Sequence, residues 1–323
     1  MGYLYAIAGA LLFGANGSLT KLIVGAGLSP TQLTQFRTLG TCILAGIILL
    51  ITDRAAFRLR PKQLLIMAVL GVLGVAVLQA SYAGALGLLP VGIALLLEYT
   101  AVLMVALVAF FIFREKVKAR IWIAIGCVLI GLAIVARIWA SDLNPVGVLL
   151  ALLAAVSLTL YFVVGERQVG ATSPLAVAFW TMLFATAFWA FFSGWWQLPA
   201  SLFAKPVEIG GVLGSVHPPL IVPLLVTIVL GSFLPFLLSF SALKHLPATA
   251  AGIVASSEVL FAFVVAWIWL GEGLDVAQII GAAIVLVGIV LAQTARQGKV
   301  VDADLALSPD VATPADGGAA SRS

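Results

Sequence analysis

The sequence predicts an all-α polytopic membrane protein, and three observations support that prediction. Of its 323 residues, 63% are apolar and 9% are charged, whereas soluble globular proteins average about 45–50% and about 25%. The mean hydropathy is +1.20. Apolar runs of about 20 residues, long enough to cross a hydrocarbon core of roughly 30 Å as a helix, recur along the chain. Lipid must solvate so much apolar surface, which excludes an ordinary cytosolic enzyme.

Ten apolar runs are expected to form transmembrane helices, because a helix satisfies its backbone hydrogen bonds internally in lipid. They cover residues 3–24, 30–51, 63–82, 91–113, 121–139, 145–165, 174–196, 219–243, 249–270 and 276–293. Pro30, Pro145, Pro174 and Pro219 fall where the first turn of a helix tolerates proline. Residues 296–323 are polar and without periodicity, and we expect a disordered cytoplasmic tail.

Basic residues fall mainly on one side of the predicted bilayer. That side receives Arg54, Arg58, Arg60, Lys62, Arg114, Lys116, Lys118, Arg120, Arg167, Lys244, Arg296 and Lys299, and the other receives Lys21, Arg137 and Lys205. Cytoplasmic loops carry the excess of Lys and Arg, so both termini are expected in the cytoplasm. The net charge of +4 comes from short connecting segments and not from a polar domain, which argues against nucleic acid as a partner.

The chain also repeats itself weakly, as transporters commonly do. Matches at an offset of 157 residues include Leu89-Pro90 with Leu246-Pro247 and Glu115 with Glu272, and at an offset of 144 Ser29-Pro30 meets Ser173-Pro174. Each half holds five predicted helices, an odd number, so the second half should be inverted relative to the first. We therefore expect a first five-helix repeat over residues 1–140 and a second, inverted repeat over residues 141–295.

Several short motifs give a resemblance to a known family. The FGANGSLTK stretch, LSP followed by Phe36-Arg37, and the segments LPVGIALLLEYTAVL and LPATAAGIVASSEVLFA, which close on FREK and LGEGL, resemble the drug/metabolite transporter superfamily, EamA type. The string PVGIALLLEYT is similar to the branch that contains bacterial threonine/homoserine exporters. The resemblance implies a multi-pass permease of the bacterial inner membrane that exports amino acids or related metabolites by proton antiport.

Glu98 and Glu258 are the first candidate site residues. A carboxylate near mid-span costs roughly 2.5–3.5 kcal/mol, so intramembrane charges usually face a cavity or a partner. Glu98 lies eight residues after Pro90, and Glu258 lies eleven after Pro247, so they fall on similar faces of equivalent helices. Each could bind a substrate ammonium or exchange a proton during transport. Each could equally be a structural carboxyl that ties its helix to a neighbouring backbone.

Arg37 and Asn16 are the next candidates. Arg37 lies about seven residues into the second predicted helix, where it could contact a substrate carboxylate, snorkel to the outer surface or pair with another group. Asn16 lies between two glycines, Gly14 and Gly17, that weaken a helix. An unwound or bent segment there could offer backbone groups to a ligand, and tight packing of small residues explains the same glycines.

Other polar and aromatic side chains could line a shared pocket. These candidates are Gln79, Tyr82, Tyr99, Tyr161, Trp180 and Ser239. The aromatic ones could equally be core or lipid-facing residues. Glu115 and Glu272 each end a predicted helix beside a loop, so we expect them to anchor a gate or a loop. His217 and His245 lack spaced ligands, which gives a metal site no support.

These patterns, together with the resemblance, predict a secondary active transporter that works by alternating access. The sequence contains no Walker motif for ATP, and we expect no cofactor and no enzymatic activity. The expected partners are an amino acid or similar small metabolite, protons and membrane lipid, and the oligomeric state stays open. A rival prediction is an exporter of lipophilic cations or other apolar metabolites, recognised by glutamates and by aromatics such as Trp180. A membrane-embedded enzyme would need clustered His, Asp or Ser, which the sequence does not show.

Overall fold

The structure is a computed structural model, and it describes residues 2–101, 104, 107–108, 119–135, 143–169, 172–210, 214–243, 254, 257–273 and 275–295. In chain order its elements are α1 (Gly2–Gly25), α2 (Pro30–Thr52), η1 (Arg54–Phe57), α3 (Pro61–Val69), η2 (Leu70–Ala76), α4 (Val77–Leu86), α5 (Val91–Glu98), α7 (Ala119–Val135), α8 (Pro145–Val169), α9 (Pro174–Phe192), η3 (Trp195–Gln197), α10 (Ser201–Ala204), α11 (Ile221–Ile228), η5 (Val229–Phe233), α12 (Leu234–Leu243), α14 (Glu258–Leu270) and α15 (Val276–Ala295). The described part is therefore all-helical, apart from one isolated bridge between Pro206 and Pro219.

The described helices are those of a multi-pass membrane protein. Six helical segments in this part of the chain are long and apolar enough to cross a membrane, and two shorter apolar helices follow near the C-terminal end. Their outward faces are apolar: on α1, for example, Leu4, Ile7 and Leu11 are exposed. Exposed aliphatic side chains along such helices are what lipid contact requires.

Several helices are N-capped by the Ser or Asn side chain that precedes a proline in the sequence. Ser29 accepts from the Gln32 backbone N–H at 3.2 Å, and the Gln32 side chain accepts from the Ser29 N–H at 2.9 Å. The Ser173 hydroxyl caps α9 by accepting from the Ala176 backbone N–H at 3.2 Å. Each cap satisfies a backbone donor that has no partner within its helix. The predicted helix starts at Pro30 and Pro174 are thereby confirmed.

Two predicted continuous helices, 91–113 and 249–270, are interrupted in the structure. α5 ends at Glu98, a turn follows at Tyr99-Thr100, and Ala101 is helical again. α14 begins at Glu258, after a turn residue at 257. At the first break the Thr100 hydroxyl donates to the Leu97 carbonyl at 2.7 Å, and at the second the hydroxyl of residue 257 donates to the carbonyl of residue 254 at 2.6 Å. Such side-chain bonds compete with the helical ladder, so the prediction of uninterrupted helices is wrong at these points.

Two further spans contain a π-helical segment. η2 separates α3 from α4, and η5 separates α11 from α12. Both segments contain Val-Leu-Gly, with Gly74 and Gly231 matched at the same offset of 157 residues that relates the halves. Short π-helical segments occur often at functional sites. The two interruptions therefore fall at equivalent points of the two halves.

Two helix ends differ from their predicted positions. The helix expected from Pro219 begins at Ile221, because Pro219 is held in the bridge with Pro206. The helix expected to reach residue 196 ends at Phe192, and Gly194 then takes a φ of 68°, a conformation that favours glycine.

Several predictions fall outside the described residues. These are the predicted helical structure of most of residues 102–118 and of residues 136–139 and 244–253, the gate or loop role of Glu115, and the disorder of the tail 296–323.

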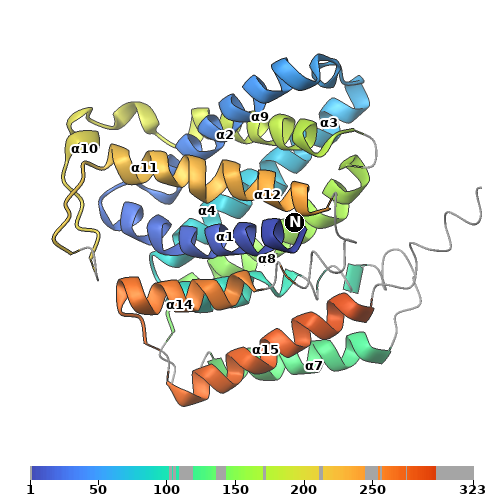
Figure 1. Cartoon of the computed structure of the whole chain (residues 1–323), viewed down its shortest axis with the longest axis vertical. Helices are drawn as coiled ribbons and strands as arrows, with labels where there is room; N and C mark the ends of the chain where they lie inside the picture. Colours follow the sequence, from blue (N-terminus) through green and yellow to red (C-terminus); the bar gives the residue numbers. More distant parts are fainter. Residues whose placement is uncertain are drawn as a thin grey trace, which may run out of the picture.

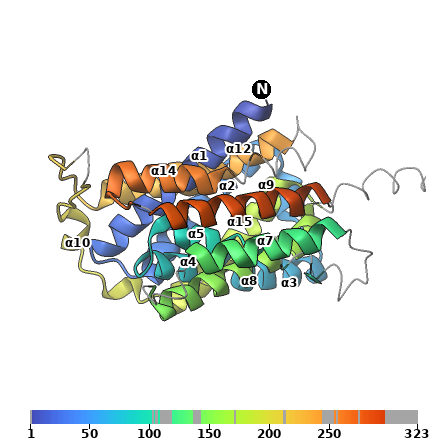
Figure 2. The same ribbon diagram turned by 90° about the horizontal axis from the view of Figure 1, so that it is seen from below.

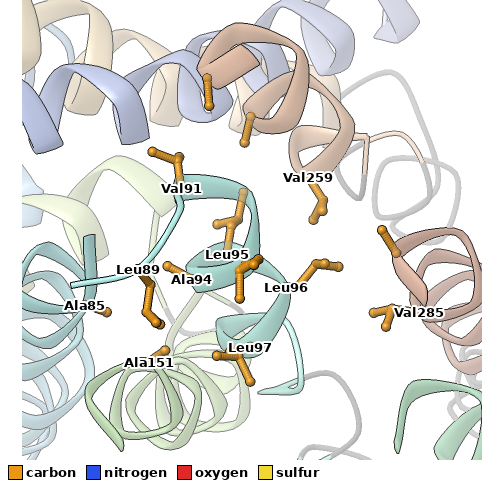
Figure 3. Close-up of a cluster of buried hydrophobic side chains, with 14 of the residues drawn as sticks. Ala85, Leu89, Val91, Ala94, Leu95, Leu96, Leu97, Ala151, Val259 and Val285 are labelled. Carbon is orange, nitrogen blue, oxygen red and sulfur yellow. The ribbon is translucent and has the colours of Figure 1, made fainter. Parts of the chain in front are cut away.

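Helix α5 lies at the centre of the bundle. All eight of its residues, Val91 to Glu98, are buried. Figure 3 shows its side chains among Ala85 of α4, Leu89 between α4 and α5, Ala151 of α8, Val259 of α14 and Val285 of α15. The last residue of this short helix, Glu98, is therefore carried into the protein interior.

The ends of α1, α5, α8 and α14 meet at one end of the bundle. The orientation predicted from the basic residues places this end outside the cytoplasm, so we call it the outer end. The Val91 N–H at the start of α5 donates to a carboxylate oxygen of Glu272, just beyond the end of α14, at 2.8 Å. Gly147, at the start of α8, lies against Leu88 and Leu89. So α5 and α8 begin at the outer end, while α14 ends there. α1 also ends there, because its Lys21 reaches the Leu89 carbonyl.

These directions agree with inverted halves. At the offset of 144 residues, α1 corresponds to α8. At the offset of 157, the predicted span 91–113, which begins with α5, corresponds to the predicted span 249–270, which ends with α14. In each pair, one member begins at the outer end and the other ends there. The last helices of the two halves, α7 and α15, run side by side along one edge of the molecule (Figures 1 and 2).

Candidate functional site

The break after α5 places a carboxylate inside the protein. Glu98 is the final residue of α5 and is 9% exposed. Its Oε2 atom has no hydrogen-bond partner among the described residues. A buried carboxylate oxygen without a partner is costly, so this atom is a candidate ligand for a cargo group or a proton.

A second carboxylate faces the same break from the other half of the chain. Glu258 is the first residue of α14, and its Oε2 accepts a hydrogen bond from the Tyr99 hydroxyl at 2.7 Å. Tyr99 directly follows Glu98, and the two glutamates interact electrostatically. The structure thus brings Glu98, Tyr99 and Glu258 to one place, where two helices are discontinuous. In transporters, discontinuous helices typically form the substrate and ion sites.

Arg37 provides a buried positive charge near Glu98. It is 6% exposed on α2, and it interacts electrostatically with Glu98 and with Tyr82. Its Nε donates to the Ser232 hydroxyl at 3.0 Å, and its Nη2 donates to the Gly231 carbonyl at 3.4 Å. Arg37 is therefore turned into the bundle and does not snorkel to the surface.

The π-helical segment η5 holds Arg37 and contacts Asn16. Asn16 is 6% exposed on α1, and its Oδ1 would lie 2.1 Å from a Cβ atom on Gly231. Only glycine allows this approach. Oδ1 has no hydrogen-bond partner in the described part of the chain. Asn16 thus adds a second unpartnered oxygen to the interior around Arg37.

The alternative of an unwound α1 near Asn16 is wrong, because α1 is an unbroken helix over Gly2–Gly25. Its glycines serve close packing instead. A Cβ atom on Gly14 would lie 2.8 Å from the Glu258 carbonyl oxygen and 2.9 Å from the Ala262 nitrogen. Small residues allow such close approach between membrane helices. Gly14 therefore lets α1 contact α14 directly beside the second carboxylate.

Helix α4 contributes Tyr82 and Gln79. Tyr82 interacts electrostatically with Glu98, Glu258 and Arg37, and so belongs to the same group. Gln79 donates to the Met182 sulfur at 3.8 Å, while its Oε1 has no partner among the described residues. Gln79 lies one turn from Tyr82 on the same helix, so its side chain falls on a similar face.

Two predicted residues, Trp180 and Tyr161, make contacts away from this group. The Trp180 indole N–H donates to the Ala56 carbonyl at 3.0 Å, in the segment between α2 and α3. Tyr161 packs against hydrophobic residues of α3, η2 and α9. Ser239 lies in α12, but its side chain is outside the described part.

Ser232 and Gly231 were missed by the sequence analysis. The available signal was the Val-Leu-Gly triplet shared by η2 and η5, because both segments interrupt equivalent helices. A single serine in an apolar run does not by itself indicate an arginine partner. Among the described residues, no three His, Cys, Asp or Glu side chains gather as a metal site would require.

Comparison with known proteins agrees with this fold. The profile of the EamA-like transporter family matches residues 1–137 and 145–294. No curated protein matches the chain. A solved protein crystal structure is 17% identical in sequence, with a TM-score of 0.61 over 92% of this chain and 99% of the other. That likeness shows the fold alone. The two family matches cover almost all of the predicted helices, and the chain therefore belongs to the EamA-like transporter family, within the drug/metabolite transporter superfamily.

Proposed function

We propose that the protein is a proton-coupled secondary transporter that exports amino acids or related small metabolites across the inner membrane. Ten helices in two inverted five-helix repeats, over residues 1–140 and 141–295 with both termini cytoplasmic, would alternate access to the interior site. Family membership supports transport of a small metabolite. The threonine/homoserine exporter branch is the specific cargo hypothesis, and it rests on the PVGIALLLEYT string.

The observation that carries the proposal is the meeting of opposite charges at the broken helices. Glu98 ends α5 with an unpartnered oxygen, and Arg37 interacts with it electrostatically from α2. A zwitterionic amino acid offers an ammonium for the glutamate and a carboxylate for the arginine. Glu258, whose oxygen accepts from Tyr99, would then serve as the second ammonium ligand or as a proton carrier.

The rival proposal, export of lipophilic cations, has less support. It assigned recognition to glutamates and to aromatics such as Trp180, but the Trp180 indole is bonded to the Ala56 carbonyl. A cation alone would also leave Arg37 unexplained, because a buried arginine repels a positive cargo. Efflux assays against quaternary amines, run beside amino acids, separate the two cargo classes.

The decisive experiment is counterflow in proteoliposomes with a panel of labelled amino acids over a range of pH. We compare the parental protein with Glu98→Gln and Glu258→Gln, which keep side-chain size but remove the charge. Glu208→Gln is the matched control, because Glu208 is exposed in the segment between η3 and α11.

We expect at least one interior variant to lose exchange or to change its pH profile, and the control to behave as the parent. The proposal fails if both interior variants exchange every amino acid at the parental rate with an unchanged profile. Exchange of quaternary amines alone would instead support the rival cargo.

A further inference from the structure

An ion pair closes the outer end of the bundle. Lys21, near the end of α1, forms a salt bridge with Glu272, just beyond α14. The two side chains are 31% and 18% exposed, so water is only partly excluded. The Lys21 ammonium also donates to the Leu89 carbonyl, between α4 and α5, at 3.1 Å. One cation therefore joins three separate parts of the chain.

Glu272 makes a second, separate contact with helix α5. Its Oε2 accepts from the Val91 backbone N–H at 2.8 Å, while its Oε1 faces Lys21. Val91 is the first residue of α5, whose leading N–H groups have no partner within the helix. A carboxylate at that position is also favoured by the helix dipole. Glu272 thus acts both as a salt-bridge partner and as a cap.

The capped helix leads directly to the interior site. α5 has eight residues, Val91 to Glu98, which is about 12 Å at 1.5 Å per residue. Glu272 holds one end of this helix, and Glu98 forms the other end. Because all eight residues are buried, a displacement at the site would be transmitted along a packed, rigid segment.

Tyr82 provides a second link between the ion pair and the site. It interacts electrostatically with Glu98, Glu258 and Arg37, and also with Glu272. Its hydroxyl would lie 2.9 Å from a Cβ atom on Gly17, one helical turn before Lys21. Tyr82 therefore lies between the Lys21–Glu272 ion pair and the interior site.

We propose that Lys21 and Glu272 form the outer gate of the transporter, and that opening toward the outside requires both their ion pair and the α5 cap to break. This inference rests on the proposed function, because a gate has meaning only for a protein that alternates access. The competing interpretation is that Glu272 merely anchors the loop between α14 and α15.

The test follows the accessibility of one buried position without any cargo. Thr20 precedes Lys21 and is 0% exposed, so a cysteine placed there reports opening of the outer end. The protein carries Thr20→Cys and Cys127→Ser, is reconstituted in nanodiscs, and is treated with a charged, membrane-impermeant maleimide. Native Cys42 is kept as an internal reference, because it is buried in a different cluster with Val75, Met182 and Ala185.

Three variants separate the two contacts of Glu272. Lys21→Met and Glu272→Gln remove the ion pair, but glutamine keeps an oxygen that can cap Val91. Glu272→Ala removes both contacts. Lys205→Met is the matched control, since Lys205 is an exposed cation in the segment between α10 and α11. Thermal unfolding and gel filtration show which variants are folded.

We expect labelling of the introduced cysteine to accelerate by about tenfold in Lys21→Met and Glu272→Gln, as for loss of one charge-assisted hydrogen bond, and more in Glu272→Ala. Labelling of Cys42, and of the introduced cysteine in Lys205→Met, should stay at parental rates. Parental labelling of the introduced cysteine in folded Lys21→Met and Glu272→Gln overturns the gate proposal. Faster labelling of Cys42 in the same variants overturns it too, since it indicates general loosening.

Labelling needs no substrate, so its outcome is independent of the counterflow result. Intact counterflow with unchanged labelling rejects the gate alone. Faster labelling of the introduced cysteine in a protein that exchanges no amino acid rejects the proposed cargo and leaves the closure in place.

Discussion

Gly14→Ala should destabilise the protein, because the added methyl group would clash with two backbone atoms of α14. The added Cβ would lie 2.8 Å from the Glu258 carbonyl oxygen and 2.9 Å from the Ala262 nitrogen. Neither atom can rotate away, so α1 and α14 must separate by about 0.5 Å to regain ordinary contact. Overpacking of this kind costs about 1–3 kcal/mol. At roughly 2–4 °C per kcal/mol, the melting temperature should fall by roughly 2–12 °C.

The matched control is Gly126→Ala on α7. A Cβ atom at Gly126 would meet nothing within 4 Å, and alanine favours a helix over glycine by about 0.5–1 kcal/mol. Its melting temperature should therefore equal or exceed that of the parent. Both variants are measured by intrinsic tryptophan fluorescence during heating of the purified protein in detergent. The close packing of α1 on α14 is refuted if Gly14→Ala melts at the parental temperature.

Three further substitutions probe the site and its surroundings. Tyr99→Phe removes the 2.7 Å hydrogen bond to Glu258. It should change the pH profile of counterflow, while the melting temperature falls by only a few degrees. An unchanged pH profile would mean that this bond has no part in exchange. Ser232→Ala removes one hydrogen bond from Arg37 and should raise the KM for an exchanged amino acid about tenfold to 150-fold, as for one bond to a charged group. A changed maximal rate with the same KM would contradict a role in positioning Arg37. Trp180→Phe loses only its bond to a carbonyl in a connecting segment, so it should lower stability by about 1 kcal/mol and leave KM unchanged.

The helical segments were predictable because apolar length alone specifies a membrane span. α1 and α2 follow their predicted ranges within two residues, since a lipid-spanning helix has a fixed minimum length. The breaks at Glu98 and Glu258 were not predictable from hydropathy. They depend on whether the Thr100 and Ser257 hydroxyls bond to a preceding carbonyl, and serine and threonine occur in continuous membrane helices as well.

The candidate site was only partly predictable for a similar reason. The cost of intramembrane charge singles out Glu98, Glu258 and Arg37 in any interpretation of the sequence, but their roles in transport stay predictions. The partners of these residues come from other helices, and sequence spacing does not report contacts between helices. Lys21 and Glu272 are 251 residues apart, so the sequence identified each of them separately and not the ion pair.

The two halves of the chain match in the positions of their helices, but some charged residues of the first half have uncharged equivalents in the second half. At the offset of 144 residues, Gly165 stands where the first half has Lys21, and Thr181 stands where it has Arg37. If the repeats are inverted, the sequence equivalents of Lys21 and Glu272, which are Gly165 and Glu115, are expected at the inner end. Gly165 has no charged side chain, so the direct sequence equivalent of the Lys21–Glu272 pair is missing. Without cargo, the state closed at the outer end should therefore be the more stable one, and cargo or proton binding near Glu98 must supply the difference in free energy that opens it.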